Sequence, residues 1–390
     1  MFRILAVALF TCLSTCVVRA EEPLQVPSAA GRSDIQPAVA LACGATTVLL
    51  GEASHGTASA IDLKAALVEE LIARCGFTHI VFESQLYDFE ALKRKYSTSS
   101  ASIGDLLNAI GGLWATSKEL DGLARFLHDR ALTHELTLSG IDCQVGGAMN
   151  LYSQTALAAD LTASLPPDRR THCTAEIQRL NQWRFDVSHP YDERFKAMLS
   201  ACLCDAALAT PEADIAQQLL LSSYASFLDL SAKDYANQRD RVMFQNYSSI
   251  MRTMPQRTKS IIWTASRHAL LAEYRGIVSL GSLISRESPG AVKAIAFVAK
   301  EGTYGFQGGP TLTIEPAQPG TVEADAFSGS SEAGITFLSG PQLSRLSGRP
   351  SRLLGYGQFL EGPWARLFDG VFVVRSERVP AYVRPRTPQQ

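Results

Sequence analysis

Two histidines and three acidic residues stand out in this sequence of 390 residues, because they follow short apolar runs at which buried strands are expected to end. The set consists of Glu52, His55, Glu83, Asp142 and His268. A neutral imidazole can take a proton from water, and a carboxylate can orient the ring and stabilise the imidazolium that forms. Single acids at strand–helix junctions also cap helices, but the convergence of five such residues favours general acid–base hydrolysis.

Apolar runs and helical periodicity predict the elements that would position these residues. Strands are expected at 46–50, 78–82, 136–141, 260–263, 291–298 and 370–374, and helices at 61–75, 120–134 and 239–252. Alternating strands and helices are typical of parallel crossovers, so the predicted class is α/β, with a mostly parallel central sheet flanked by helices. A large helical insertion at about 150–255 would form one wall of a cleft. Ligands of such sheets bind outside the carboxyl ends of the strands, where the five residues lie.

Several other functional classes are disfavoured by what the sequence lacks. It contains no Gly-x-Ser-x-Gly string for a nucleophilic serine, no P-loop, no Gly-x-Gly-x-x-Gly and no His-Glu-x-x-His. The 36 basic residues nearly balance the 38 acidic ones, which leaves a net charge of -2. A chain with so little net charge and no basic stripe is not expected to bind nucleic acid.

The N-terminus has the pattern of a secretory signal peptide at 1–20. One arginine precedes an apolar run, and small residues lie just before Glu21. The run is shorter than the ~20 residues that a membrane-spanning helix needs. A loose leader is expected at 21–45 and a single domain at 46–390, in a protein that is exported to the periplasm or secreted and has no transmembrane segment after signal removal.

Six cysteines remain after the signal peptide, an even number that suits disulfides in an oxidising compartment. Cys43 lies nine residues before Glu52, and Cys75 lies eight residues before Glu83. If the two strands are neighbours that end level, both cysteines reach the opposite edge of the sheet, where they could pair. We therefore expect a disulfide between Cys43 and Cys75.

The other four cysteines leave more than one pairing open. Cys173 is expected to pair with either Cys202 or Cys204 within the insertion. Cys143 would be unpaired or bonded to the remaining cysteine. A zinc site is disfavoured, because a single residue separates Cys202 from Cys204 and no paired zinc-ligand spacing is present.

The string Gly-Glu-Ala-Ser-His-Gly-Thr at 51–57 resembles the erythromycin esterase family. Further matches follow in order along the chain, at Glu83, Trp114, Glu119, Gly140-Ile141-Asp142-Cys143-Gln144, Arg239-Asp240 with Met243 and Asn246, and Phe368-Asp369-Gly370. One short motif would be weak, but six in the family's order over 51–374 are specific.

The resemblance implies a hydrolase that opens a lactone, a macrolide among them, or another carboxylic ester, by direct water attack without an acyl-enzyme and in the context of antibiotic resistance. His55 would be the general base, Glu52 and Glu83 would orient it and the water or bind the substrate, and His268 would complete the catalytic set. The substrate-binding residues expected on the resemblance are Lys64, Trp114, Glu119 and Asp142, and Arg267 is a further substrate-binding candidate of this chain.

Two positions depart from the family's pattern. The family commonly has arginine nine residues after the motif histidine, where this chain has Lys64, which keeps the charge but loses the bidentate fork. The family's His-Asn-x-His string is Ala265-Ser266-Arg267-His268 here, so its first histidine is Ala265 and its second is His268. Arg267 could supply a replacement charge to a developing oxyanion.

The cofactor-free esterase would have a small-molecule ester or lactone as its partner. Two other interpretations of the same residues remain open. A metal-dependent hydrolase or peptidase would use Glu52, His55, Glu83 and His268 as ligands of a divalent metal such as zinc or manganese. A non-catalytic binding protein could retain the same scaffold, and Ala265 is compatible with that interpretation.

Overall fold

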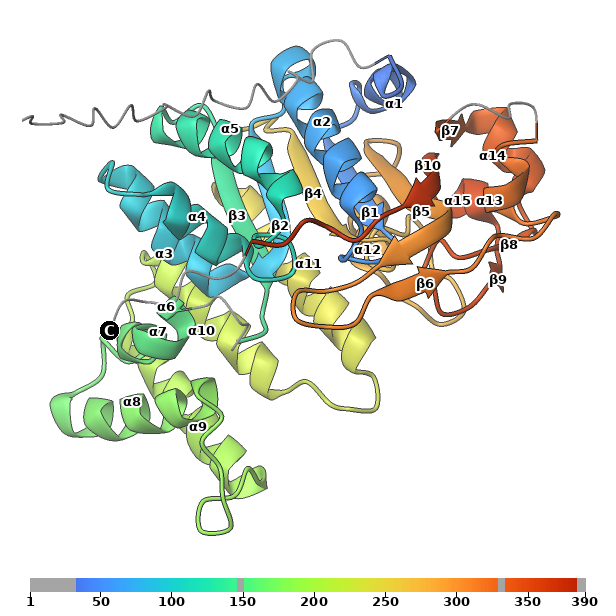
Figure 1. The fold of residues 1–390 in the computed structure, drawn as a ribbon. Coiled ribbons are helices and arrows are strands. Elements are labelled where there is room, and N and C mark those ends of the chain that lie inside the picture. The colour runs from blue at the N-terminus through green and yellow to red at the C-terminus, as the bar shows by residue number, and fades with distance from the viewer. Residues whose placement is uncertain (1–32, 146–150, 329–333, 384–390) are drawn as a thin grey trace, which may run out of the picture.

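The protein is described from a computed structural model, which covers residues 33–145, 151–328 and 334–383 (Figure 1). The signal peptide predicted at 1–20 lies outside the described residues, as does most of the leader at 21–45. None of the described helices combines the length and the apolar character needed to cross a membrane.

A sheet of eight strands forms the centre of the fold. Seven strands follow the order β3-β2-β4-β1-β5-β10-β7, and β6 pairs with β5. The bounds are β3 Thr137–Asp142, β2 His79–Gln85, β4 Ser260–Ala265, β1 Thr47–Glu52, β5 Val292–Tyr304, β10 Gly370–Glu377, β7 Ile335–Ser339 and β6 Leu312–Ile314. Neighbours are parallel, except that β7 runs antiparallel to β10 and β6 to β5. The predicted mostly parallel sheet is confirmed, and a strand is found at each of the six predicted positions.

The strand order places β4 between β1 and β2. Thr47 of β1 pairs in register with Ser260 of β4, which pairs on its other side with His79 of β2. The three strands therefore start level and have similar lengths, so their carboxyl ends meet at one edge. We call this the carboxyl edge, and it carries the predicted site residues.

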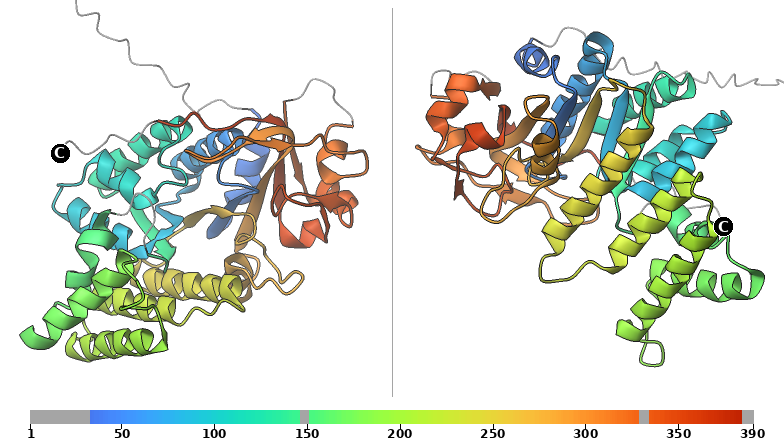
Figure 2. Two further views of the ribbon diagram at one scale, coloured as in Figure 1. Left: turned by 60° about the horizontal axis from the view of Figure 1, so that its bottom comes forward. Right: turned by 180° about the vertical axis from the view of Figure 1, so that it is seen from behind.

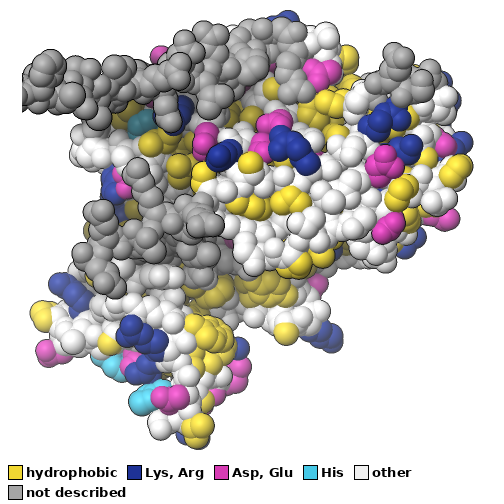
Figure 3. Space-filling model, in the orientation of Figure 1, with side chains coloured by type: hydrophobic (Ala, Val, Ile, Leu, Met, Phe, Trp, Pro, Cys, Tyr) yellow, Lys and Arg dark blue, Asp and Glu magenta, His cyan; other side chains and the backbone are white. Residues whose placement is uncertain are grey.

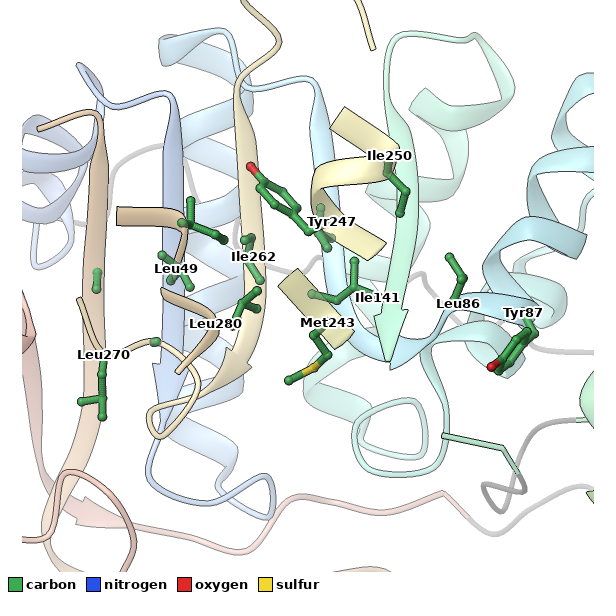
Figure 4. Close-up of a cluster of buried hydrophobic side chains, with 14 of the residues drawn as sticks. Leu49, Leu86, Tyr87, Ile141, Met243, Tyr247, Ile250, Ile262, Leu270 and Leu280 are labelled. Carbon is green, nitrogen blue, oxygen red and sulfur yellow. The ribbon is translucent and has the colours of Figure 1, made fainter. Parts of the chain in front are cut away.

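Helices cover both faces of the sheet because alternate residues of each buried strand point to opposite sides. Val48 and Leu50 of β1 pack against α1 (Gln36–Ala42), α2 (Ala58–Cys75) and α5 (Asp121–Leu132), whereas Leu49 packs toward the other face. That second face is covered by α11 (Tyr235–Thr253) and α12 (Leu280–Glu287). Figure 4 shows Met243 and Tyr247 of α11 directed at this face.

The insertion predicted at about 150–255 is helical. Its helices are α6 Leu151–Thr155, α7 Leu157–Leu161, α8 Pro167–Asn181, α9 Glu193–Ala209, α10 Ile215–Leu228 and α11. Helices α8 and α9 project from the body of the molecule (Figure 2), and a disulfide between Cys173 and Cys202 joins them. This bond decides the pairing that the sequence leaves open, since Cys204 is exposed and free and Cys143 is buried and free.

Local signals in the sequence begin and end several of the helices. Gly76 follows α2 with φ of 71°, a left-handed conformation that glycine adopts without steric cost. Ser102 and Asp105 form a reciprocal capping box at the start of α4. The remaining elements are α3 Leu86–Ser97, α4 Ile103–Ile110, the 3₁₀ helix Lys118–Leu120, α13 Val322–Asp325, α14 Gly340–Leu346, β8 Pro350–Ser351, β9 Leu360–Glu361 and α15 Trp364–Leu367.

Helix α1 is a difference from the sequence-based expectation, because it lies inside the segment assigned to a loose leader. Ala38 and Ala42 are fully buried and Val39 nearly so, and all three belong to the cluster that covers the first face of the sheet. Pro37 occupies the first turn of the helix, where its missing amide proton costs nothing. A proline in this position does not disrupt the helix, so the last part of the expected leader is helical and packed on the sheet.

The expected disulfide between Cys43 and Cys75 is present, with its Cα atoms 5.0 Å apart. The two strands used to predict it are not neighbours, because β4 lies between them. The bond instead brackets the start of β4: Lys259 Nζ donates to the carbonyl of Cys43 at 2.6 Å and to that of Cys75 at 2.8 Å. The prediction held because the strands start level across all three positions. Two disulfides are compatible with an exported protein.

Charges of both signs are mixed over the surface. On the face drawn in Figure 3, lysine and arginine lie among aspartate and glutamate rather than in a continuous basic stripe.

Replacing Cys43 and Cys75 together by serine should lower the free energy of unfolding by about 4 kcal/mol in the loop-entropy model, because the bond closes a loop of sequence separation 32. Urea denaturation of the oxidised protein measures the change. Cys204→Ser is the matched control and should leave stability unchanged, since this thiol is exposed and free. Equal stabilities of the double variant and the wild type would contradict the prediction.

Candidate active site

The end of β1 and the loop after it bring Glu52 and His55 together. Nδ1 of His55 lies 2.7 Å from Oε1 of Glu52. The loop is shaped by a 2.6 Å bond from Thr57 Oγ1 to the Ser54 carbonyl and by the close approach of Gly56, where a Cβ would lie 2.2 Å from a backbone oxygen. Only glycine fits at position 56, which explains why a glycine directly follows the histidine of the motif.

Glu52 is 98% buried, and several groups hold it in place. Trp114 donates from Nε1 to Oε1 at 3.0 Å, and the ammonium of Lys64 forms an ion pair with Oε2. Burial alone would raise the pKa of Glu52, but the charge of Lys64 and the hydrogen bond of His55 outweigh it and lower the pKa below its usual value. Glu52 is therefore a fixed carboxylate that holds the His55 ring.

Lys64 lies beneath Glu52, with no exposed surface. Its ammonium lies 4.1 Å from the centre of the Trp263 ring and donates to the Thr264 carbonyl at 3.2 Å. Burial lowers the pKa of Lys64 to about 8, although the charge of Glu52 counteracts the shift. Lys64 is thus a counter-ion inside the protein, which differs from the substrate contact implied by the family resemblance.

Glu83 forms a second centre at the end of β2. The pairing of β2 with β3 is irregular between Phe82 and Gln85, the stretch that carries Glu83. Oε1 accepts from Arg239 at 2.8 Å and lies 3.1 Å from Nε2 of His268. Oε2 accepts from the hydroxyl of Thr264 at 2.7 Å and from the amide of Ala265 at 2.9 Å. Both oxygens of Glu83 are therefore occupied.

His268 is clamped between two carboxylates. Nε2 faces Glu83, and Nδ1 lies 2.7 Å from Oδ1 of Asp240. Burial would lower the pKa of His268, but the charges of Glu83 and Asp240 raise it to about 9. The raised pKa favours the imidazolium form, whose two N–H groups can donate to Glu83 and Asp240, so His268 is less suited than His55 to accept a proton.

Arg239 and Asp142 join the insertion to the sheet. The guanidinium of Arg239 donates to Asp142 at 2.8 and 3.1 Å and also reaches Glu83. Asp142 ends β3 and Arg239 lies in α11, so their bidentate contact holds the insertion helix against the carboxyl edge. Asn246 lies about two helical turns after Arg239 in α11 and donates to the Ile141 carbonyl at 2.9 Å.

The structure brings together most of the residues singled out in the sequence. Glu52, His55, Lys64 and Trp114 form one cluster, and Glu83, Asp142 and His268 form the adjacent one. Trp114 is completely buried, so it supports Glu52 rather than touching a substrate.

Two predicted substrate-binding residues lie outside these clusters. Glu119 is bound to Arg378 and to the amide of Ala381, and so fastens the C-terminal segment rather than lining the site. Arg267 is half-buried in the turn after β4, and no hydrogen bond or ion pair of its guanidinium is found among the described residues.

Arg239 and Asp240 belong to the network of the site but are absent from the site predicted from the sequence, in which they are only part of a family-like helix. The sequence carries a signal for them, because these two adjacent charged residues precede Met243 and Asn246, which pack on the sheet. Charged side chains buried on such a helix need charged or hydrogen-bonding partners, which indicates a polar network at this place.

The side chains expected as metal ligands in the metal-dependent interpretation are already bonded to protein groups. Both nitrogens of His268 and both oxygens of Glu83 are bound to protein groups, and Glu52 is shared by Lys64, Trp114 and His55. Within the ranges that the structure describes, no group of three or more His, Cys, Asp or Glu side chains is placed to hold a metal. The atom left for chemistry is Nε2 of His55, which has no hydrogen-bond partner among the described residues, in a side chain that is 21% exposed.

Stability should fall as the pH rises from about 6.5 to about 9, because His268 has a pKa of about 9 when folded and an ordinary value of 6.5. The folded state then holds a proton that the unfolded chain has released, so the stabilisation is complete below pH 6.5 and lost as the pH passes 9. The full effect is at most about 3 kcal/mol. Urea unfolding over this pH range should show the decline in the wild type and a flatter curve in His268→Gln.

His189→Gln is the matched control for this measurement, because His189 is an exposed histidine in the loop between α8 and α9. It should keep the wild-type pH dependence. An unchanged slope in His268→Gln would show that the clamped imidazolium does not contribute.

Comparisons with solved structures agree with the architecture. A Bacillus cereus protein of known crystal structure matches with a TM-score of 0.70 and 14% identity, covering 90% of this chain and 93% of that one. A succinoglycan biosynthesis protein matches with a TM-score of 0.70 and 16% identity, with the same coverage. The erythromycin esterase EreC, as a mutant in its open conformation, matches with a TM-score of 0.64 and 15% identity, covering 89% of this chain and 95% of that one. At such identities the similarity establishes the fold alone.

The sequence itself carries the family assignment. No curated protein sequence gives a significant match. The profile described as erythromycin esterase matches residues 72–375, which is most of the chain and includes Glu83, Asp142, Arg239 and His268. The matched residues follow the string at 51–57 and include the later motifs, so the family resemblance is confirmed, and this chain belongs to the erythromycin esterase family.

Proposed function

We propose that this protein hydrolyses a lactone or another carboxylic ester by direct attack of a water molecule that His55 activates. Membership of the erythromycin esterase family supports a hydrolase. The observation that carries the finer proposal is the pair of Glu52 and His55: one ring nitrogen is held at 2.7 Å by a buried carboxylate, and the other is open. A carboxylate bound to Nδ1 fixes the tautomer in which Nε2 can accept a proton.

The proposed reaction balances without a covalent enzyme intermediate. Nε2 of His55 takes a proton from water while the water oxygen bonds to the carbonyl carbon, and Glu52 stabilises the imidazolium that forms. The tetrahedral intermediate then breaks its bond to the alkoxide oxygen, and the imidazolium returns the proton to that oxygen. The products are a carboxylic acid and an alcohol, or a hydroxy acid when the substrate is a lactone.

A cofactor-free mechanism is part of the proposal. A metal bound by Glu83 and His268 would have to displace Arg239 and break two hydrogen bonds of Glu83 at Thr264 and Ala265. A cation beside Arg239 and an imidazolium would also be repelled. These contacts disfavour the metal-dependent hydrolase or peptidase. Export to the periplasm or the medium completes the proposal, and the signal-like N-terminus and the two disulfides support it.

His55→Ala should lower kcat for any hydrolysed ester by on the order of 10²–10⁴-fold, because it removes the proposed proton acceptor. The assay is hydrolysis of a panel of lactones and carboxylic esters, macrolides included, with and without a chelator. Circular dichroism should be unchanged, since the His55 side chain is partly exposed.

His128→Ala is the matched control, because this histidine is bonded to Tyr96 away from the site, and it should retain activity. Full turnover by His55→Ala would contradict the proposed base. Turnover that a chelator abolishes and added metal restores would contradict the cofactor-free mechanism.

Lys64→Met should move the acid limb of the kcat/KM pH profile upward by about one pH unit. Removing the ammonium leaves the charge of Glu52 uncompensated beside His55, and an uncompensated carboxylate favours the protonated imidazole. Lys64→Arg is the matched control, because it keeps a positive charge under Glu52, and its acid limb should stay in place. Identical profiles for Lys64→Met and the wild type would show that Lys64 does not act through Glu52.

A further inference from the structure

The charges at the carboxyl edge are balanced overall but unevenly exposed. Four carboxylates lie there, and none is more than 5% exposed; they are Glu52, Glu83, Asp142 and Asp240. Each is covered by a cation or by hydrogen-bond donors. The side chains that solvent reaches at this edge include His55, Arg239 and Arg267, of which two are permanent cations. A ligand that approaches the edge therefore meets positive charge, while the negative charge is shielded within the protein.

Backbone contacts place Arg267 close to the loop of His55. Ala265 pairs in register with Glu52, and the amide of Ser266 donates to the Glu52 carbonyl at 2.8 Å. The hydroxyl of Ser266 bonds to the Gly51 carbonyl at 2.8 Å, which ties the two loops together. Arg267 follows directly, so it leaves β4 at the level where the chain of His55 leaves the neighbouring β1.

The guanidinium of Arg267 differs from the other cations of this edge. Lys64 is paired with Glu52, and Arg239 is paired with Glu83 and Asp142. Arg267 is half-buried, yet within the described ranges no carboxylate or carbonyl accepts its N–H groups. Partial burial of an unpaired charge costs free energy, and a guanidinium presents a planar fork that fits a carboxylate or a phosphate.

We propose that Arg267 is a specificity-determining residue that binds an anionic group of the substrate, so that the natural substrate is an ester or lactone carrying a carboxylate or phosphate. The proposal rests on the proposed function, because it names the substrate class of that same site. It differs from a role for Arg267 in stabilising the oxyanion, which would affect every ester equally.

Two matched esters test the proposal. 4-Acetoxybenzoate carries a carboxylate that is too distant to attack its own ester, and 4-acetoxybenzamide is its neutral counterpart. In Arg267→Ala, KM for the benzoate should rise by about ten- to hundredfold, as expected for the loss of a hydrogen-bonded charge pair. KM and kcat for the benzamide should be unchanged, and Arg267→Lys should restore part of the preference.

Arg257→Ala is the matched control, because Arg257 is exposed just before β4, at the opposite edge of the sheet, and it should leave both substrates unaffected. An equal fall in kcat for the two esters would overturn the proposal in favour of oxyanion stabilisation. Equal KM values for the two esters in the wild type would overturn it outright.

A binding measurement distinguishes a failure of this inference from a failure of the proposed function. If neither ester is hydrolysed, calorimetry of His55→Ala with 4-acetoxybenzoate still tests the anion site, with and without Arg267→Ala. Binding that requires Arg267 supports the inference, and absence of binding contradicts it.

Discussion

The fold depends on one electrostatic constraint: four carboxylates are buried at one edge of a sheet, and each must be matched by positive charge or by hydrogen-bond donors. An isolated ionised carboxylate in a protein interior is strongly unfavourable, whereas a paired and fully hydrogen-bonded one is tolerated. The partners come from separate parts of the chain, namely Lys64 from α2, Arg239 from α11 and His268 from the turn after β4. The same contacts that neutralise the edge therefore hold a covering helix and the insertion against the sheet.

This constraint also decides where reactivity can lie. Saturating the oxygens of Glu83 and both nitrogens of His268 makes them poor bases and poor metal ligands, although their residue types suit both roles. His55 differs because only its Nδ1 is held, by Glu52. Two histidines that look alike in sequence therefore differ in the structure: His268 is buried between two carboxylates, whereas His55 is held at Nδ1 alone and is the base of the proposed mechanism.

Much of the sheet could be predicted from the sequence, because strands buried on both faces are continuous apolar runs and the acids mark their ends. The strand order could not, since the position of β4 between β1 and β2 depends on pairing between segments some 180 residues or more apart. The same limit applies to the site. Glu52 and His55 are three residues apart and could be paired in advance, whereas the pairing of Glu83 with Arg239 joins residues 156 positions apart. The role expected for Glu119 differs from its place in the structure for the same reason, because its partner, Arg378, lies near the far end of the chain.

Ala265 illustrates why the carboxyl edge can change its recognition without losing its architecture. The network uses this residue only through its backbone, since the amide donates to Glu83 and the strand pairs with Glu52. A side chain at this position is therefore free to vary, and the histidine of the family pattern can be absent while every carboxylate keeps its partners. In the proposed mechanism, activation stays with Glu52 at the end of β1 and with His55 in the loop after it, whereas recognition falls to groups that leave β4 beyond residue 265. The next charged group of this chain is Arg267, which under the proposed function places a permanent cation near the loop of His55.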